Sequence, residues 1–578
     1  MSNPILQRMK QLEAVKEDYD ELISLAAKYV NSRRELSKDS QRYDKKGQKR
    51  GKDIFDPSPA AALEIWRDGM QGFMVSKSLD WFKSEMSDYT LNDVDEVRKF
   101  LQEYDEAMYA AYRASNFYSI LNEWFNDAGS IGTGTVYTEE DIKNGTEVHT
   151  PIHLREVFIA ENKHQFVDVL FRKFQLTARQ AVQKFDTNRL TGDVIANAIS
   201  NPEKGHEFIH ACFPNDERQF ASIAATNKKY KSVYVQTKGA GGGSINQPNQ
   251  TSEALVNANG NPISGIVKEG GYDYFPYAVW RLRKNSDEVY GYSPAMDMMV
   301  SIEKSNTIGK TLLQAAHLSV KPAKNVPEHM RGNVHLGPDG HNYYERGGDK
   351  IEVIGGKINF PVGIDREEYY EKYIQGGYHV EFFKAFIGRK GEATREEILQ
   401  IKSEQAQLMG PQVDRLSDDG LEKNFEATAA IEDRAGRLPP MPQILVDRMA
   451  EEEESGVLRK TRINVRFTGP LAQAQKRMFT LQPIQNGMDE LGKASVFFPN
   501  IIDRVNEDKL SEAILDASDF PQDLMRSTAE VEEIRAERAA QLAQQQAMEQ
   551  AGQMADAVPK LSKKPEEGSP AEMIGAEL

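Results

Sequence analysis

Two long helical patterns, separated by a segment that cannot build a core of its own, constrain this chain more than any other feature. Ser293-Pro294 opens the first pattern, over residues 293–320, and the second runs over residues 365–387. The segment between them, 321–364, is rich in glycine and proline and holds only short β-like pieces such as NVHLG and KIEVIGG. Such a segment has to bury its surface against neighbouring subunits. The order therefore predicts a chain that works as an oligomer.

Composition limits the class of protein. With 578 residues the chain exceeds one ordinary core, which predicts two or more domains or one large elaborated body. The balance of 72 Lys and Arg against 88 Asp and Glu gives a net charge of −16, so the overall field repels nucleic acid and anionic membranes. Contact with DNA would need a local patch.

Compartment signals are few but consistent. Cys212 is the only cysteine, which excludes an intrachain disulfide and fits assembly in a reducing compartment. The N-terminal residues lack the apolar core of a secretory signal, and no run of about 18 apolar residues follows anywhere. We expect a soluble protein made in the cytosol, with no membrane partner.

The chain alternates helical and strand-like regions. Residues 5–37 have helical periodicity, whereas 136–236 alternates apolar and polar residues in strand-like runs, with one helix, TARQAVQKF, between them. Another long helical pattern contains Gly410-Pro411, which predicts a kink. A polar Ala/Gln/Glu helix and an acidic tail end the chain. These patterns predict an α+β, mainly helical protein.

The motifs that could indicate catalysis each lack residues that the corresponding chemistry requires. The loop Gly129–Thr135 (GSIGTGT) lacks the Lys-Ser/Thr of a Walker phosphate loop and follows a helix, so a helix end entering a strand is the better interpretation. The ten histidines form no metal motif, and pairs such as Asp418-Asp419 fit solvated helix faces or turns. We predict no catalytic residue, metal or cofactor. A nucleotide-binding enzyme using Gly129–Thr135 is the unfavoured alternative.

Two basic stretches stand out against the acidic balance. Arg389-Lys390, between Gly388 and Gly391, lies between two helical patterns at the tip of a turn. In a single copy this pair is a solubilising turn. In a ring with the tip at the axis, many copies would line a hole with positive charge and attract a phosphate backbone without reading sequence. The run at 42–52 is either a solvated loop or a contact with a subunit or nucleic acid.

The order of several short stretches resembles the head-to-tail connector, or portal protein, of short-tailed double-stranded DNA bacteriophages. The resemblance spans roughly residues 50–480. It rests on WFKSEMSD (81–88), SNFY (115–118), AGSIGTGTVY (128–137), YGYSPAMDMM (290–299), GEATREEI (391–398), GPQVDRL (410–416), RAGRLPPMP (434–442) and VRFTGPLAQAQKR (465–477). The family often has a Thr-Ala-Thr-Glu-like sequence where this chain reads Glu392-Ala393-Thr394-Arg395, a departure that affects the register of the loop.

The resemblance implies a ring of about twelve copies at one capsid vertex of the virion, assembled in the host cytoplasm. Double-stranded DNA would be packaged through its channel and later ejected, without sequence specificity. The implied partners are the terminase large subunit, the major capsid and scaffold proteins, and a tail adaptor. A shorter-class neck or tail adaptor ring is the alternative within phage particles, although adaptors are usually far shorter than this chain.

The family's parts map onto this chain as expectations. The wing takes 1–292, and residues 395–474 form a long kinked helix and complete the wing. The stem helices are 293–320 and 365–387, the clip is 321–364 and the tunnel loop is 388–394. The crown takes 475–525, and 526–578 forms a Gln/Ala-rich helix and a disordered tail. The implied DNA-channel residues are Arg389, Lys390 and Arg395. The implied clip contacts with terminase or adaptor are Arg331, His335, His341, Arg346 and Lys350.

Overall fold

The computed structural model divides into two compact units. The first comprises Met1–Lys83, Tyr104–Pro439 and Val465–Gln485, and the second Ser84–Glu103, Pro440–Asn464 and Asn486–Leu578. The structure describes residues 4–34, 51–92, 94–219, 224, 226–237, 255–256, 262–263, 265–321, 323–330, 332, 334–335, 341, 343, 347–348, 350–354, 360–388, 409–455, 461–469, 481–495, 498, 505–517, 526 and 528–561.

Helices account for most of the described secondary structure. Those of the first 300 residues or so are α1 (Pro4–Val30), α2 (Ser58–Met74), α3 (Tyr89–Asn92), α4 (Asp95–Ala114), α5 (Phe117–Ile131), α6 (Ala178–Lys184), α7 (Gly192–Ser200) and α8 (Pro294–Asp297). The later ones are α9 (Met299–Val320), α10 (Phe360–Gly377), α11 (Val380–Gly388), the π-helix η5 (Leu416–Leu421), α13 (Glu422–Arg434), α14 (Gln443–Ser455), α16 (Gln482–Ser495), α17 (Glu507–Ala517) and α18 (Thr528–Leu561). No described helix has the length and apolar character that a membrane crossing requires.

Two antiparallel sheets form the centre of the first unit. One has the strand order β10-β7-β6-β5-β4 and the other β11-β2-β3. Their strands are β2 (Thr133–Asp141), β3 (Thr146–Ile152), β4 (Val157–Glu161), β5 (Val167–Thr177), β6 (Gly205–Pro214), β7 (Tyr230–Gln236), β10 (Ile266–Tyr272) and β11 (Tyr277–Arg281). Three smaller two-stranded sheets pair β1 (Phe82–Met86) with β14 (Ile463–Phe467), β8 (Leu255–Val256) with β9 (Pro262–Ile263), and β12 (Ala323–Asn325) with β13 (Glu352–Ile354).

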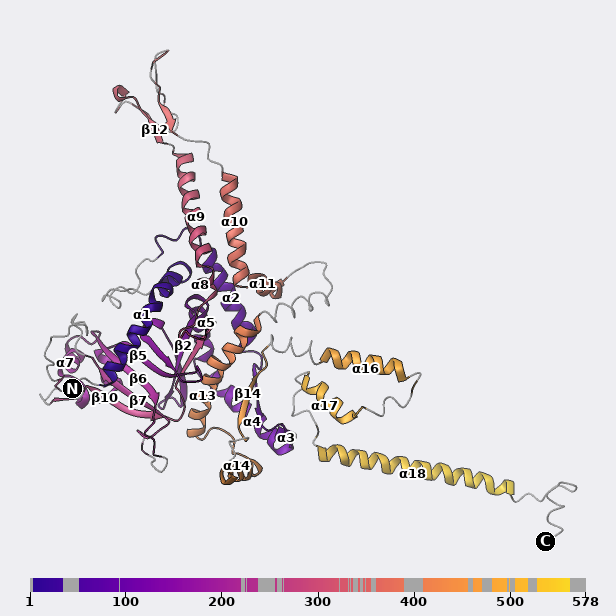
Figure 1. Cartoon of the computed structure of the whole chain (residues 1–578). Coiled ribbons are helices and arrows are strands. Elements are labelled where there is room, and N and C mark those ends of the chain that lie inside the picture. The colour runs from indigo at the N-terminus through magenta and orange to yellow at the C-terminus, as the bar shows by residue number, and fades with distance from the viewer. Residues whose placement is uncertain are drawn as a thin grey trace, which may run out of the picture. The chain divides into compact units, whose positions relative to one another are not determined.

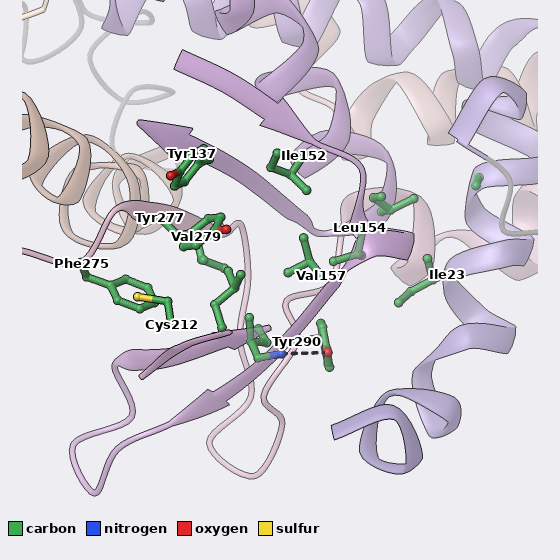
Figure 2. Close-up of a cluster of buried hydrophobic side chains, with 14 residues drawn as sticks. Ile23, Tyr137, Ile152, Leu154, Val157, Cys212, Phe275, Tyr277, Val279 and Tyr290 are labelled. Atoms are coloured by element: carbon green, nitrogen blue, oxygen red, sulfur yellow. Dashed lines mark hydrogen bonds between the residues drawn. The ribbon is translucent and has the colours of Figure 1, made fainter. Parts of the chain in front are cut away.

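A core cluster joins the two central sheets to α1. Ile23 from α1, Tyr137 from β2 and Cys212 from β6 all lie in it, and each is at most 2% exposed. Figure 2 shows this cluster and the hydrogen bond, 3.3 Å long, that the Ile159 N–H donates to the Tyr290 hydroxyl. Burial raises the pKa of the Cys212 thiol, which behaves here as a small apolar side chain.

A helical hairpin leaves this core. Helices α9 and α10 run side by side, and β12 and β13 lie at their far ends (Figure 1). The Ser293 hydroxyl caps α8 by accepting a hydrogen bond from the Met296 N–H, and Pro294 occupies the first turn, where its missing N–H is tolerated. At the other end, His379 has a left-handed φ of 52°, which ends α10 before α11 begins.

The α+β, mainly helical class is confirmed, and details differ from the sequence-based expectation. The helix expected over 293–320 breaks at Met298 into α8 and α9, and α10 begins at Phe360, inside the segment predicted to be β-like. Pro361 explains the second difference, because proline suits the first turn of a helix. The prediction of one helix within 136–236 is wrong, since α7 follows α6. The kink at Gly410-Pro411 stays a prediction, because the described residues resume only at Met409, directly before it.

Candidate subunit interface and channel elements

The α9–α10 hairpin is held together by close packing at glycines. A Cβ added at Gly363 would lie 2.5 Å from Leu312 Cδ2, and one added at Gly377 would lie 2.1 Å from Met298 Sδ. Glycine therefore sets the approach of the two helices at both levels. Away from this contact the hairpin exposes apolar side chains: Leu318 is 52% exposed, Tyr369 58% and Tyr373 52%. Aromatic side chains exposed in this way are typical of protein interfaces.

An asparagine clamp fixes the base of α9. Asn306 Oδ1 accepts hydrogen bonds from the N–H groups of Phe55 (2.7 Å) and Asp56 (3.3 Å). Its Nδ2 donates to the Asp53 carbonyl at 3.0 Å, so both ends of the amide are used. One turn further along the helix, a Cβ on Gly309 would lie 3.2 Å from the Phe55 carbonyl oxygen. The loop before α2 thus grips α9 through backbone groups.

The GSIGTGT stretch forms a crossing of two chain segments. Gly132 ends α5 with a φ of 78°, and a Cβ there would lie 2.3 Å from the Gly291 carbonyl oxygen. The Gly291 N–H donates to the Thr133 hydroxyl at 2.9 Å, and the Ser293 hydroxyl donates to the Ser130 carbonyl at 2.8 Å. The predicted helix end entering a strand is confirmed. Protein atoms fill the space around its glycines: backbone at Gly132, and tryptophan side chains at Gly129 and Gly134. This close packing argues against a phosphate loop.

The end of α10 is tied to the same place. The Tyr378 hydroxyl donates to the Gly129 carbonyl at 3.0 Å, and Tyr378 is fully buried beside Trp66 with their ring centroids 6.4 Å apart. A Cβ on Gly129 would lie 2.4 Å from the Trp66 ring. The segment that leads into the first hairpin helix and the end of the second helix are therefore both anchored on the last turn of α5 and the residues after it. We call this region, residues 129–133 with 291–293 and Tyr378, the stem anchor.

The tip of the hairpin is small. Strands β12 and β13 pair over three residues each, with Lys324 opposite Val353. A ladder of this size does not stand alone in water, because even a full two-stranded hairpin is marginally stable. Tyr343, between the two strands in sequence, is 91% exposed.

Comparison with known proteins places the chain in a family. A family model described as "Bacteriophage head to tail connecting protein" matches residues 2–246 and 251–525. The chain belongs to this connector family. The "Portal protein" of Salmonella phage epsilon15 is 24% identical over 565 residues, 95% of this chain and 93% of that protein. The "Probable portal protein" of Bordetella phage BPP-1 is 24% identical over 529 residues, 89% of this chain and 87% of that protein.

The identification made from the short sequence stretches is thereby confirmed, and the family's role is a structural one. The stem anchor also explains why two of those stretches occur together. Gly132 and Gly291 come from AGSIGTGTVY and YGYSPAMDMM, which lie against each other in the connector chain. Neither glycine tolerates a side chain without displacing the backbone of the other segment.

The sequence-predicted site residues are only partly described. His335, His341 and Lys350 lie between β12 and β13 and are exposed, whereas Arg331 and Arg346 fall outside the described residues. The tunnel-loop cations Arg389, Lys390 and Arg395 also fall outside them. The described chain reaches Gly388 at the end of α11 and resumes as a helix at Met409, so both flanks of that segment are helical.

A buried ion network was missed by sequence reasoning. Arg281 at the end of β11 is fully buried; its Nε donates to Asp419 Oδ2 at 3.1 Å and its guanidinium also pairs with Glu161. The π-helix η5 supplies Asp419, which is 7% exposed, so the prediction that Asp418-Asp419 lies on a solvated face is wrong for Asp419. A π-turn inside a helix is a local register change that sequence periodicity does not reveal.

A second buried polar cluster joins β3 to α13. Burial, reinforced by the nearby Glu432 carboxylate, raises the pKa of Glu147 to about 9, and burial lowers the pKa of His149 to about 3. Both side chains are therefore neutral near pH 7, although His149 Nε2 lies 3.7 Å from Glu147 Oε2. His149 Nδ1 lies 3.2 Å from Asn424 Nδ2, which donates to it. This cluster fastens the connector core and shows no nucleophile.

Proposed function

We propose that this chain is a portal subunit, which forms a ring of about twelve copies at one capsid vertex. Double-stranded DNA enters through the ring during packaging and leaves through it on ejection. The observation that carries the proposal is the anchored α9–α10 hairpin, which exposes apolar side chains in a single copy of a connector-family chain. Neighbouring copies would cover that surface, since exposed apolar patches mark association sites.

The parts of the ring follow the order of the chain. The two stem helices are 293–320 and 365–387, the clip is 321–364, and the wing comprises 1–292 with 395–474. The clip ladder between β12 and β13 is too short to stand alone, and neighbouring copies would complete it. The crown would take 475–525. The chain supplies neither catalysis nor a cofactor in this account.

Contacts with other proteins are assigned to the outer parts. Exposed His335, His341 and Lys350, together with Arg331 and Arg346, would meet the terminase large subunit and later the tail adaptor. The wing would meet the major capsid and scaffold proteins in the virion, with assembly in the host cytoplasm. The names of the two relatives, "Portal protein" and "Probable portal protein", support the portal role on which these contacts rest.

The tunnel loop 388–394 is the proposed site of DNA contact. Arg389, Lys390 and Arg395 would meet phosphates at the channel axis, where each phosphate contact positions DNA without reading its sequence. The chain as a whole has a net charge of −16, which keeps the rest of the ring from binding DNA tightly. A channel through which DNA has to move would have a few cations at one level, which contact phosphates, and acidic surfaces elsewhere, which repel DNA.

The test uses phage particles assembled with variant chains. Heads formed with the wild-type chain are expected to contain the ring and packaged DNA, and heads formed without it to remain empty. Arg389→Ala with Lys390→Ala is expected to leave the ring intact and to reduce DNA packaged or retained. Wild-type levels of packaging and retention in that double variant would remove the loop from the mechanism, and full heads without the chain would overturn the portal assignment.

A further inference from the structure

The register of the stem helices fixes which of their residues share a level. Leu312 is level with Gly363, and Met298, fourteen residues earlier, is level with Gly377, fourteen residues later. One residue up α9 therefore corresponds to one residue back along α10, as in a regular antiparallel pair. The same register puts Glu303 level with Lys372, and Lys310 level with Asp365.

These four charged residues lie on the faces that point away from the hairpin contact. At about 100° per residue, Glu303 and Lys310 lie roughly 160–180° around α9 from Leu312, and Asp365 and Lys372 lie roughly the same angle around α10 from Gly363. Burial agrees, because Lys310, Asp365 and Lys372 are exposed and Glu303 is half-buried. The outward face of α9 thus carries one acid and one base seven residues apart, and that of α10 carries Asp365 and Lys372 at the same spacing, with exposed Glu368 between them.

Among the described residues of one copy, these four charged side chains have few partners of opposite charge. Lys372 reaches Glu368 of its own helix at 4.0 Å in an exposed pair, and Lys310 lies 5.7 Å from the centre of the Phe55 ring. Among the described residues, Glu303, Lys310 and Asp365 form no ion pair. The two outward faces are complementary to each other yet lie on opposite sides of the hairpin, where they cannot meet.

A neighbouring copy in a ring would bring them together. Rotation about an axis along the stem moves a copy sideways without moving it along the axis, so α9 of one copy would face α10 of the next at unchanged levels. Resting on the ring of the proposed function, we propose that Glu303 and Lys310 of each copy pair with Lys372 and Asp365 of the next, as a charge ladder between stems.

The ladder would also set the register between copies. The sign order on α9, acid then base, matches base then acid on α10 at the same levels. A slip of seven residues would place Glu303 against Asp365, and a slip the other way would place Lys310 against Lys372. Such like-charge contacts penalise the wrong alignment, which is how charged interfaces gain specificity. Each exposed pair is weak by itself, but the ring repeats it at every interface.

The test exchanges charges without changing the net charge. One variant carries Glu303→Lys with Lys310→Glu, and the other carries Asp365→Lys with Lys372→Glu; each alone places like charges against the next copy. Ring assembly is followed by native mass spectrometry at low salt. Each variant alone is expected to need about tenfold more protein for half-assembly, an effect that added salt reduces. The matched control, Lys99→Glu with Glu103→Lys, exchanges another exposed pair and should assemble normally.

Two rescues separate pairing between copies from other roles. An equal mixture of the two variants should assemble as an alternating ring, because every interface then joins opposite charges, and the fourfold variant should assemble alone. Rescue by the fourfold variant but not by the mixture would mean pairing within a copy, and normal assembly of each variant alone would also overturn the ladder. A wild-type chain that forms no ring would instead overturn the proposed function.

Discussion

Replacing Gly132 by alanine tests the stem anchor, because this glycine is needed for two separable reasons. Its φ of 78° lies in the left-handed region, where a non-glycine residue costs about 1–2 kcal/mol. A Cβ there would also lie 2.3 Å from the Gly291 carbonyl oxygen and 2.5 Å from Tyr292 Cα, which are backbone atoms that cannot swing aside. Overpacking of this kind adds about 1–3 kcal/mol.

Gly145 provides the matched control. It has a φ of 64°, and a Cβ there would meet nothing within 4 Å. Gly145→Ala should therefore cost only the left-handed conformation, about 1–2 kcal/mol. Gly132→Ala should cost about 2–5 kcal/mol in all. The difference between the two variants isolates the contact between residues 132 and 291.

Hydrogen exchange measured by mass spectrometry reads this difference locally. The Leu282 N–H donates to the Gly132 carbonyl at 3.0 Å, and the Gly291 N–H donates to the Thr133 hydroxyl at 2.9 Å. A loss of about 2 kcal/mol corresponds to roughly 30-fold faster exchange at these amides. Gly145→Ala should leave them unchanged. Equal exchange at these amides in both variants would refute the stem anchor as a tight crossing.

Three further perturbations test the described contacts. Asn306→Ala should leave the Phe55 and Asp56 N–H groups without their acceptor and lower the free energy of unfolding by about 2–4 kcal/mol. Thr307→Ala should have little effect. Hydrogen exchange at the Phe55 amide measures the difference between the two variants. Arg281→Met removes the buried cation that Glu161 and Asp419 share, and the two acids keep only Lys284 and Arg415 as partners. It should cost about 2–3 kcal/mol in denaturant unfolding, and a cost below about 1 kcal/mol would contradict the network. Because the pKa of Glu147 rises from its ordinary 4.5 to about 9 on folding, the folded chain keeps a proton that the unfolded chain loses, so stability should fall as the pH rises between these values. Glu147→Gln should flatten that slope in unfolding measured from pH 5 to 8.5, and an unchanged slope would count against a neutral Glu147.

Short sequence patterns were enough to predict several features of the fold. Ser293-Pro294 marks a helix start through capping chemistry that needs no distant partner, and the side chain of Ser293 does cap α8. The missing Lys-Ser/Thr of GSIGTGT and the helical pattern before it predicted a helix end entering a strand, which α5, Gly132 and β2 form. The connector family followed from the order of short stretches rather than from any one of them.

Distant contacts could not be predicted in this way. Gly132 needs to be glycine because of Gly291, and no local rule links positions so far apart in the chain. Asp419 reads as a solvated acid, yet the π-helix turns it toward Arg281 of β11. The complementary charges of α9 and α10 become visible only once the contacts at Gly363 and Gly377 fix the register of the hairpin.

The mass and shape of the assembled protein test the central claim most directly. Native mass spectrometry, combined with class averages of negatively stained particles, should show a closed ring of about twelve copies of the 65.1 kDa chain around a central hole. A compact dimer without a hole, under conditions in which the chain is folded and binds nucleotide, would contradict the account.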